Sequence, residues 1–424
     1  MDIDHLVAAA QARYVAAHPV SRRWWERAMA VMPGGNTRTV LHVDPFPIRV
    51  TQAEGKYLHD AEGHTYVDLL GNYTAGLFGH SPVDITDAIH KAVDRGIAYG
   101  AVHEDEVRLA ELIVGRFPSI EQVRFTNSGT EANLMAIATA LHHIGRSGVL
   151  VFDGGYHGGV LTFGSKGRQV NVPHRWSVAR FNDLASCEPL MSDPVNDIGC
   201  VVVEPMQGSS GCIPAEPGFL EGLRELCDRH GAVLVFDEVM TSRLSPGGMQ
   251  KLTGVLPDMT TLGKYLAGGM TFGAFGGRRP IMAAYDPATG GELAHAGTFN
   301  NNVVSMAAGV AAIGSVLDDE RLAALNARGD RLRAALDEAL APVGMCATGI
   351  GSILTVHPVP GPVRSVDDLA GGDERLRELW FFASLAAGFY VARRGFIALS
   401  LEISDDDVER YVAAVAAWAG TLAT

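Results

Sequence analysis

The chain has 424 residues, of which 47% are apolar and 19% are charged, and its formal net charge is −14. A chain of this length and composition is predicted to form a globular protein with two or three packed domains. The negative charge disfavours binding to nucleic acid or to an anionic membrane surface, and no apolar run approaches the length of a membrane span.

Two further features favour a cytoplasmic protein. The first residues, MDIDHLVAAAQARY, lack the basic segment that precedes the apolar run of a signal peptide. The five cysteines are scattered and form no CxxC pair, which is typical of free thiols in a reducing compartment rather than of a disulfide framework or a zinc site. We therefore expect no metal.

The N-terminal part is expected to hold a helix followed by short strands. Residues 3–30 have a helical pattern, which the glycines of MPGG at 32–35 interrupt. Residues 47–70 are then predicted to form short strands joined by tight turns at Glu54–Gly55 and Glu62–Gly63.

The middle of the chain alternates apolar runs with a helical pattern. QVRFTNSG and GVLVFDGG end in glycine, whereas DIGCVVVEP and AVLVFDEV are nearly continuous apolar runs that end in an acid. Between the last two, apolar side chains recur at helical spacing over residues 219–227. Apolar strands separated by helices predict an α/β fold, with a mostly parallel sheet flanked by helices on both faces.

After about residue 303 the pattern is mostly helical, and it ends with a helix that Ser404 is expected to cap. We predict a large α/β domain over residues 65–305. A smaller α+β domain would be built from both chain ends, residues 1–64 and 306–424.

Ligands of such sheets bind at the carboxyl ends of the strands, so the residues after each strand are candidates for a site. Ser128, Gly129 and Thr130 follow a strand and open a long helix, where free backbone N–H groups and the positive helix end favour a phosphate. An ordinary capping box, with Ser128 or Thr130 as the cap and Glu131 in the first turn, explains the same residues.

Two further strand ends carry candidate side chains for a planar ligand. Tyr156 lies in the glycine-rich loop VFDGGYHGG, where its ring could stack on the ligand, and we assign no role to the neighbouring His157. Asp237 ends the strand in AVLVFDEV, and its carboxylate could hold a proton on a heterocyclic nitrogen while Val239 packs on the ring face. A helix-capping aspartate would give the same sequence.

Lys264 lies in the apolar, glycine-flanked stretch TTLGKYLAGG and is one of only five lysines. Desolvation makes a neutral lysine amine available for a Schiff base. By itself this lysine is explained better by a side chain that reaches water. Together, a phosphate site, a stacking aromatic, an aspartate for a ring nitrogen and a desolvated lysine on successive strand ends indicate pyridoxal 5′-phosphate (PLP) as cofactor.

The sequence resembles the class III aminotransferases, a family of PLP-dependent enzymes of fold type I. The matching stretches, which are spread over nearly the whole chain, are NSGTEA, GGYHG, VEPMQG, VFDEVMTSR, TTLGKYLAGG and HAGTFNNN. The resemblance implies a homodimer with its active sites at the subunit interface.

The resemblance also assigns the residues at the cofactor's phosphate and at its reactive carbon. Ser128, Gly129 and Thr130 hold the phosphate, and Thr298 in GTFNNN reaches the phosphate in the partner subunit. Lys264 forms the Schiff base with the cofactor and moves the proton during catalysis.

The resemblance also places a second set of residues around the cofactor ring. Tyr156 stacks on the ring, and Val239 packs on its other face. Asp237 pairs with the pyridine nitrogen, and Glu204 supports this region without binding the cofactor directly.

Within the family, MPGGNTRTVL, NYTAGLFGHS and VARRGFIALS resemble bacterial β-phenylalanine aminotransferases. This implies that Arg38 binds the substrate carboxylate, that Arg394 binds the carboxylate of the keto acid and swings aside for an apolar side chain, and that Tyr73 lines the pocket. The family pattern has an acid before this tyrosine, where this chain has Asn72. Arg393 is expected to be an ordinary surface arginine.

The expected reaction is transamination of a β-amino acid such as (S)-β-phenylalanine, with 2-oxoglutarate or pyruvate as acceptor, by a ping-pong mechanism. One alternative is a glutamate-1-semialdehyde 2,1-aminomutase, which shares the PGG and DEVM stretches but typically has Ser-Gly-Asn-Pro where this chain has FNNN. Another is a non-catalytic PLP-binding regulator, which would need a fused DNA-binding segment or a damaged site.

Overall fold

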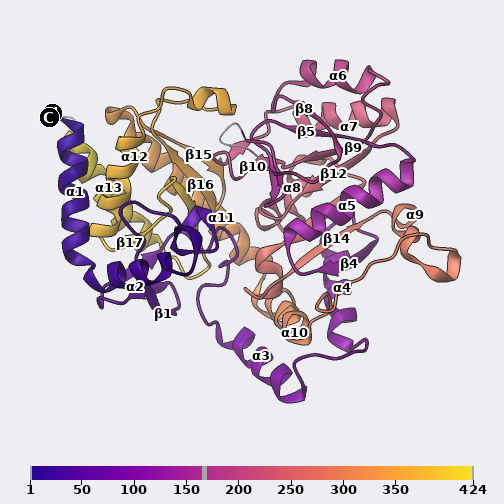
Figure 1. Ribbon diagram of the computed structural model, residues 1–424, viewed down its shortest axis with the longest axis horizontal. Coiled ribbons are helices and arrows are strands. Elements are labelled where there is room, and N and C mark those ends of the chain that lie inside the picture. Colours follow the sequence, from indigo (N-terminus) through magenta and orange to yellow (C-terminus); the bar gives the residue numbers. More distant parts are fainter. Residues whose placement is uncertain (1, 165–169, 423–424) are drawn as a thin grey trace. The chain divides into compact units, whose positions relative to one another are not determined.

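The computed structural model describes residues 2–164 and 170–422, and it divides into two compact units (Figure 1). The terminal unit consists of Met1–Pro82, Leu325–Pro362 and Leu369–Thr424, and the central unit consists of Val83–Ala324 and Val363–Asp368. The sequence analysis placed the boundaries at residues 64 and 305. The terminal unit extends beyond 64 because the strand at Thr65–Asp68 pairs with strands of that unit.

The central unit contains a seven-stranded sheet in the order β4-β14-β13-β12-β9-β5-β8. Neighbours in the run β13-β12-β9-β5-β8 are parallel, whereas β14 is antiparallel to both β13 and β4. The prediction of a mostly parallel sheet is therefore confirmed. The strands of this sheet are β4 (Gln122–Thr126), β5 (Gly148–Phe152), β8 (Arg175–Ala179), β9 (Ile198–Val203), β12 (Val233–Asp237), β13 (Met259–Gly263) and β14 (Gly273–Gly277).

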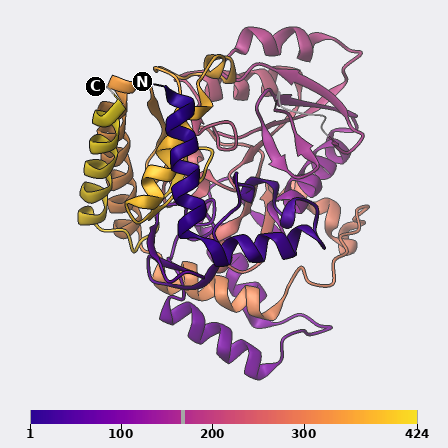
Figure 2. The ribbon, with the colours of Figure 1, turned by 60° about the vertical axis from the view of Figure 1, so that its left-hand side comes forward.

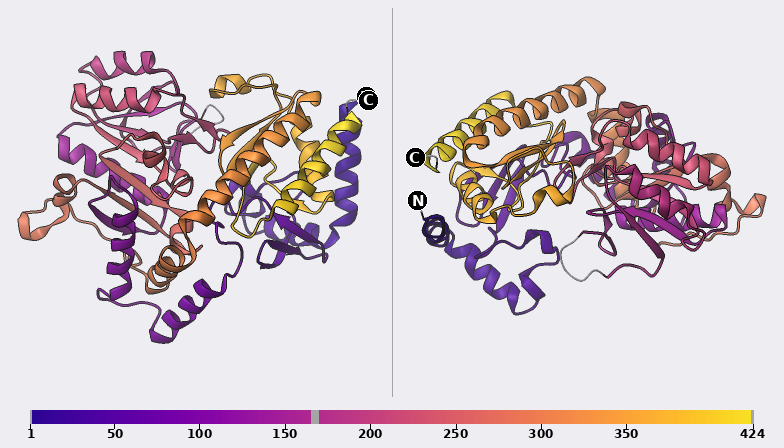
Figure 3. Two further views of the ribbon diagram at one scale, coloured as in Figure 1. Left: turned by 180° about the vertical axis from the view of Figure 1, so that it is seen from behind. Right: turned by 90° about the horizontal axis from the view of Figure 1, so that it is seen from above.

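Apolar residues explain why these strands form the core. Every residue of β5, β9, β12, β13 and β14 is buried, as expected for strands covered on both faces. Figures 1 and 3 show helices on either side of the sheet. The helices of this unit are α3 (Val83–Arg95), α4 (Glu104–Arg116), α5 (Gly129–Ile144), α6 (Leu184–Ser192), α7 (Phe219–His230), α8 (Gly248–Thr253), α9 (Arg279–Met282) and α10 (Val303–Ala311).

Two small hairpins accompany the large sheet. The hairpin of β6 (Tyr156–Gly158) and β7 (Leu161–Thr162) follows β5, and the hairpin of β10 (Met206–Gln207) and β11 (Ile213–Pro214) follows β9. Both therefore begin just beyond the carboxyl ends of buried parallel strands, where a ligand of this sheet would bind.

The terminal unit holds two smaller sheets, with the strand orders β1-β2-β3-β17 and β15-β16-β18. The predicted turns are present at Gly55 and Gly63, which have φ angles of +51° and +91°. Strands β15 to β18 were not predicted individually. The sequence pattern in this part of the chain indicated mainly helix, and each of these strands is too short to give a clear strand pattern. The strands are β1 (Val50–Glu54), β2 (Tyr57–Asp60), β3 (Thr65–Asp68), β15 (Cys346–Ile350), β16 (Ile353–His357), β17 (Phe389–Tyr390) and β18 (Phe396–Ala398).

Helices from both chain ends pack together in the terminal unit, where α12 contacts both α1 and α13 (Figure 2). The expected helix over residues 3–30 is in fact two helices, because Pro19 cannot continue the first and instead begins the second. His18 lies at this junction. The helices are α1 (Ile3–Ala17), α2 (Pro19–Met29), α11 (Asp319–Leu340, whose first residues belong to the central unit), α12 (Glu374–Ala386) and α13 (Asp405–Leu422).

Other expectations from the sequence are also met. Ser404 caps α13, since its Oγ accepts a hydrogen bond from the Asp407 N–H at 3.2 Å. All five cysteines are buried thiols rather than disulfides. Among the described residues, every helix is too short or too polar to cross a lipid bilayer.

Candidate active site

The loop between β4 and α5 is built as a reciprocal cap. Ser128 has extended backbone angles, and its Oγ accepts a hydrogen bond from the Glu131 N–H at 3.2 Å. The Glu131 Oε2 accepts in turn from the Asn127 N–H at 2.8 Å. Gly129 and Thr130 are the first two helical residues, so their N–H groups have no partner within the helix. The capping interpretation and the anion-site interpretation therefore describe the same loop.

Glycines allow three segments to meet closely at this loop. A Cβ atom on Gly129 would lie 2.9 Å from the Cγ2 of Val239, and a Cβ on Gly158 would lie 2.3 Å from the Oγ1 of Thr130. A Cβ on Gly263 would lie 3.3 Å from the Cγ1 of Val239. These contacts bring Val239, Gly129 and Thr130 together with the residue that precedes Lys264.

Asp237 ends the buried strand β12, and polar partners surround its carboxylate. Its Oδ2 accepts hydrogen bonds from the His157 Nδ1 and the Asn133 Nδ2, each at 2.8 Å. Its Oδ1 accepts from the Val239 N–H at 3.0 Å. Because Asp237 is only 4% exposed, these bonds offset the cost of burying its charge.

His157 and Glu204 extend this cluster. Burial alone would lower the pKa of His157, but the hydrogen bond to Asp237 and the charges of Asp237 and Glu204 raise it above its ordinary value. Burial raises the pKa of Glu204 to about 7. The Glu204 Oε2 accepts from the Tyr156 N–H at 3.0 Å, so this carboxylate holds the backbone of the predicted stacking residue.

Two members of the cluster, His157 and Asn133, were missed by the sequence analysis. The sequence analysis assigns His157 no role, although its place after a strand and next to Tyr156 is a usable signal. Asn133 had no comparable signal, because it lies one turn inside α5 and only the fold brings it to Asp237. The Oδ1 of Asn133 accepts from the Thr261 hydroxyl at 2.7 Å, which connects α5 to β13.

Lys264 directly follows β13, the strand beside β12 in the sheet. It is half-buried, and its φ angle of +57° is unusual for a residue with a side chain. A residue with a side chain in the left-handed conformation is strained, and such strained residues are concentrated at functional sites. Asp237 is the last residue of β12, and Lys264 is the first residue after β13. Because these neighbouring strands are parallel, both residues lie at the carboxyl end of the sheet.

Tyr156 and Thr298 are the exposed members among the predicted cofactor-binding residues. Tyr156 is 44% exposed, and Thr298 is exposed in the turn after His295. This turn is tied to the β4–α5 loop, because the Asn127 Nδ2 donates to the Asn300 Oδ1 at 3.0 Å.

The three predicted substrate residues lie together within the terminal unit. The guanidinium carbons of Arg38 and Arg394 lie 5.5 and 5.0 Å from the ring centroid of Tyr73. The Arg38 Nη1 donates to the Asn72 Oδ1 at 2.9 Å. Arg393, in contrast, pairs with Glu378 at 2.7 Å.

A left-handed turn positions this group. Gly71, Asn72, Tyr73 and Thr74 have φ angles of +51°, +44°, +54° and +79°. The turn places the Tyr73 ring in a buried position, with its hydroxyl donating to the Val40 carbonyl at 3.1 Å. Burial raises the pKa of Tyr73, and the two arginines counteract this in part.

Known proteins identify the fold. Residues 40–351 match the family model of class III aminotransferases. The chain is 50% identical over 420 residues to the β-phenylalanine transaminase of Variovorax paradoxus, covering 99% of this chain and 96% of that protein. The chain belongs to the class III aminotransferases.

Solved structures agree with this assignment. The structure of a β-phenylalanine aminotransferase from Variovorax paradoxus superposes with a TM-score of 0.96 at 50% identity, over 99% of this chain and 98% of that one. A transaminase with PLP bound superposes with a TM-score of 0.86 at 30% identity, over 95% and 97%. The aminotransferase is also 38% identical to the glutamate-1-semialdehyde 2,1-aminomutase of Nitratidesulfovibrio vulgaris (strain DP4), over 92% of this chain and 96% of that protein.

This aminotransferase uses PLP, and the residues of the central unit fit that cofactor. The glycines around Val239 leave a space that a larger side chain would fill. Such a space lets the backbone come close to a flat ligand. The polar groups also match the cofactor. The N-terminus of a helix suits its phosphate, and a buried carboxylate suits its protonated ring nitrogen.

Proposed function

We propose that this aminotransferase transfers the amino group of a β-amino acid, with (S)-β-phenylalanine as the representative donor, to 2-oxoglutarate or pyruvate. The observation that carries the proposal is the pair of arginines beside Tyr73. The pair provides two carboxylate-binding groups next to one aromatic ring, which suits a donor and an acceptor that both carry a carboxylate. The β-phenylalanine transaminase at 50% identity supports the same donor class.

Arg38 is proposed to bind the donor carboxylate. Its side chain is exposed, and among residues 2–164 and 170–422 it forms no ion pair. Its hydrogen-bond partner, Asn72, is neutral and leaves the positive charge uncompensated. An arginine in this state binds an incoming carboxylate more strongly than one already paired with an acid.

Arg394 is proposed to bind the acceptor carboxylate and to make way for the donor's aromatic side chain. Its guanidinium lies 5.0 Å from the Tyr73 ring centroid and 5.5 Å from that of Phe396. A planar guanidinium that stacks on aromatic faces can be replaced there by an aromatic ring, which is flat and of similar thickness. Tyr73 and Phe396 would then hold the side chain of the donor.

The residues of the central unit are proposed to serve the cofactor. PLP, when bound, supplies the electron sink for breaking a bond at the substrate carbon that carries nitrogen. Asp237 keeps the ring nitrogen protonated, and His157 and Asn133 hold its carboxylate in place. The Lys264 Nζ takes the proton from the substrate carbon and returns it later in the reaction. Tyr156 and Val239 pack on the ring.

The phosphate is proposed to bind at Ser128, Gly129 and Thr130, whose loop is already shaped by the Ser128–Glu131 cap. Thr298, exposed on a turn, would reach the phosphate of a second subunit, so that a homodimer completes both sites. The uniformly buried thiols support a reducing, cytoplasmic setting.

The test is a panel of amino donors offered to the purified holoenzyme. Both enantiomers of β-phenylalanine, aliphatic β-amino acids and α-amino acids are each incubated with 2-oxoglutarate, and glutamate is measured. We expect the highest kcat/KM for (S)-β-phenylalanine. Faster turnover of α-amino acids would contradict the donor class, and rearrangement of a substrate without any acceptor would indicate the mutase reaction instead.

The role of Arg38 is tested with two substitutions. Arg38→Gln and Asn72→Asp should each raise the donor KM by about tenfold, the first by removing the charge and the second by neutralising it with a neighbouring carboxylate. Arg393→Gln is the matched control, because Arg393 is already paired with Glu378. An unchanged KM in Arg38→Gln would show that Arg38 does not bind the donor, whereas an unchanged KM in Asn72→Asp alone would show that a neighbouring acid leaves Arg38 able to bind it.

A further inference from the structure

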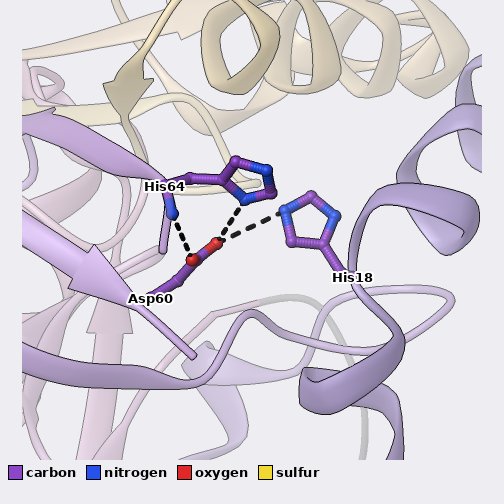
Figure 4. Close-up of side chains that lie close together, drawn as sticks. All are labelled: His18, Asp60 and His64. Carbon is purple, nitrogen blue, oxygen red and sulfur yellow. Dashed lines mark hydrogen bonds and ion pairs between the residues drawn. The ribbon is translucent and has the colours of Figure 1, made fainter. Parts of the chain in front are cut away.

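The terminal unit contains a group of two histidines and one carboxylate that transamination does not use. It consists of His18 between α1 and α2, Asp60 at the end of β2, and His64 in the turn before β3 (Figure 4). The Asp60 Oδ2 lies 2.9 Å from the His64 Nδ1 and 3.6 Å from the His18 Nε2. One nitrogen or oxygen atom from each residue lies within 4.8 Å of the others.

Hydrogen bonds around this group hold its atoms in place. The His18 Nδ1 lies 2.7 Å from the carbonyl oxygen of Tyr14. Because a carbonyl only accepts, the Nδ1 carries a proton. The Nε2 faces the Asp60 Oδ2 and also lies 3.1 Å from the Tyr66 hydroxyl, so a cation bound to this nitrogen would replace that hydrogen bond. A backbone carbonyl that orients a histidine in this way is a usual neighbour of metal-binding histidines.

The carboxylate of Asp60 is oriented in the same manner. Its Oδ1 accepts from the backbone N–H groups of Glu62 at 3.0 Å and of His64 at 2.8 Å. Its Oδ2 is left to the side chains, where the Tyr66 hydroxyl also donates to it at 3.0 Å. Asp60 and His18 are both buried, at 3% and 5% exposure, so the pair is held rigidly.

The spacing suits a small tetrahedral cation. With bonds of about 2.0–2.1 Å, two ligand atoms of a tetrahedral Zn²⁺ lie about 3.3 Å apart. The two distances measured from the Asp60 Oδ2, 2.9 and 3.6 Å, lie on either side of this value. Two imidazoles and one carboxylate are also the ligand types that Zn²⁺ accepts.

A cavity gives access to the group. It has a volume of about 470 Å³, and His18, His64 and Tyr66 line it together with apolar residues such as Phe382 and Trp418. The His64 side chain is 46% exposed, so a cation can arrive from solvent. Water from this cavity can reach the two histidines that line it.

We propose that the His18 Nε2, the Asp60 Oδ2 and the His64 Nδ1 bind one Zn²⁺ ion per chain, with water in the fourth position. The ion takes the place of the proton on the His64 Nδ1, which is released to solvent. It joins the α1–α2 junction to the β2–β3 hairpin, two segments far apart in the sequence. Its role is to stabilise the terminal unit, separately from the PLP chemistry.

The test uses the PLP-loaded full-length enzyme after dialysis against a chelator. Zn²⁺ is titrated by calorimetry, and the metal content is measured after gel filtration. We expect one Zn²⁺ per chain and a higher unfolding temperature, with kcat unchanged by chelation. In His64→Gln, affinity should fall by at least ~100-fold, because a direct ligand is lost. His64 is chosen because its half-exposed ring can be replaced with little risk to folding.

A matched control and a spectroscopic measurement complete the test. His42→Gln removes a histidine that also lies 3.6 Å from an aspartate, Asp44, but on an exposed surface, and it should bind Zn²⁺ as the wild type does. Co²⁺ in the wild type should give the intense visible bands of a tetrahedral site, and these should be absent in His64→Gln. No uptake by the wild type, or equal affinity in the wild type and His64→Gln, would overturn the proposal.

Discussion

Two of the buried aspartates, Asp237 in the central unit and Asp60 in the terminal unit, are built alike but have different neighbours. In each, Oδ2 accepts from a histidine Nδ1, at 2.8 Å from His157 and at 2.9 Å from His64, while Oδ1 accepts from backbone N–H groups. Near Asp237 there is a second acid, Glu204, and the excess of negative charge favours the proton on His157.

Near Asp60 the additional group is instead a second imidazole, His18. There, the third group adds a nitrogen ligand rather than a second negative charge, which suits a cation that replaces the proton on the His64 Nδ1. The same aspartate–histidine unit thus serves to keep a proton in one region and to offer ligands in the other, and the third group decides between the two.

The largest expected effect is the difference between removing a lysine of the central unit and removing one of the terminal unit. Lys264→Ala should abolish turnover and the visible absorbance of the bound cofactor, because the chain then lacks the amine that moves the proton. Lys56→Ala is the counterpart in the terminal unit, where the Lys56 Nζ lies 2.5 Å from the Asp407 Oδ2. It should keep both properties and lose only stability. Retention of the absorbance band by Lys264→Ala would contradict the assignment.

Next in size is the pair of aspartate substitutions. Asp237→Asn should lower kcat by at least ~100-fold, since an amide does not hold a proton on a ring nitrogen as a carboxylate does. Asp60→Asn should leave kcat unchanged. Steady-state kinetics with β-phenylalanine as donor measure both, and an equal loss in the two variants would show that the clusters do not differ in function.

A smaller effect depends on pH. The pKa of His157 is raised in the folded protein, so its charged pair with Asp237 stabilises fully below the ordinary value of 6.5 and is lost as pH rises through the folded value. His157→Gln should therefore cost about 2 kcal/mol in mildly acidic solution and less in alkaline solution. Urea unfolding of the wild type and the variant over a pH series measures this. A cost that is instead larger in alkaline than in mildly acidic solution would show that His157 is neutral in the folded protein.

The smallest expected effect concerns His64 without metal. Its ring is half-exposed, so His64→Gln should change the free energy of unfolding by at most ~0.5 kcal/mol in the presence of a chelator. With Zn²⁺ present, the difference from the wild type should grow with metal concentration. A large loss of stability in chelator would instead identify the cluster as a purely structural hydrogen-bond network.

The sequence predicted the central unit better than the terminal unit for a physical reason. Ser128, Asp237 and Lys264 each lie directly at or after an apolar strand, and the carboxyl ends of parallel strands meet at one edge, so local patterns indicate a common site. Asn133 escaped this reasoning because its contact with Asp237 depends on how α5 crosses the sheet.

The Asp60 group was beyond the sequence analysis, which expected no metal. His18 was placed inside a continuous helix, and its position became meaningful only through the break at Pro19. His64 and Asp60 look like ordinary turn residues in the hairpin sequence. Only the packing of α1 and α2 against that hairpin brings the three side chains together.

The left-handed turn at residues 71–74 limits how this pocket can be re-engineered. Asparagine and aspartate tolerate positive φ far better than bulky or β-branched residues, so position 72 can change charge beside Arg38 but not size. Since a left-handed residue other than glycine, asparagine or aspartate costs roughly 1–2 kcal/mol, libraries that vary position 72 freely would contain many members of lowered stability. Selectivity for different donors is therefore better sought at side chains with ordinary backbone angles, while position 72 adjusts how tightly the carboxylate is held.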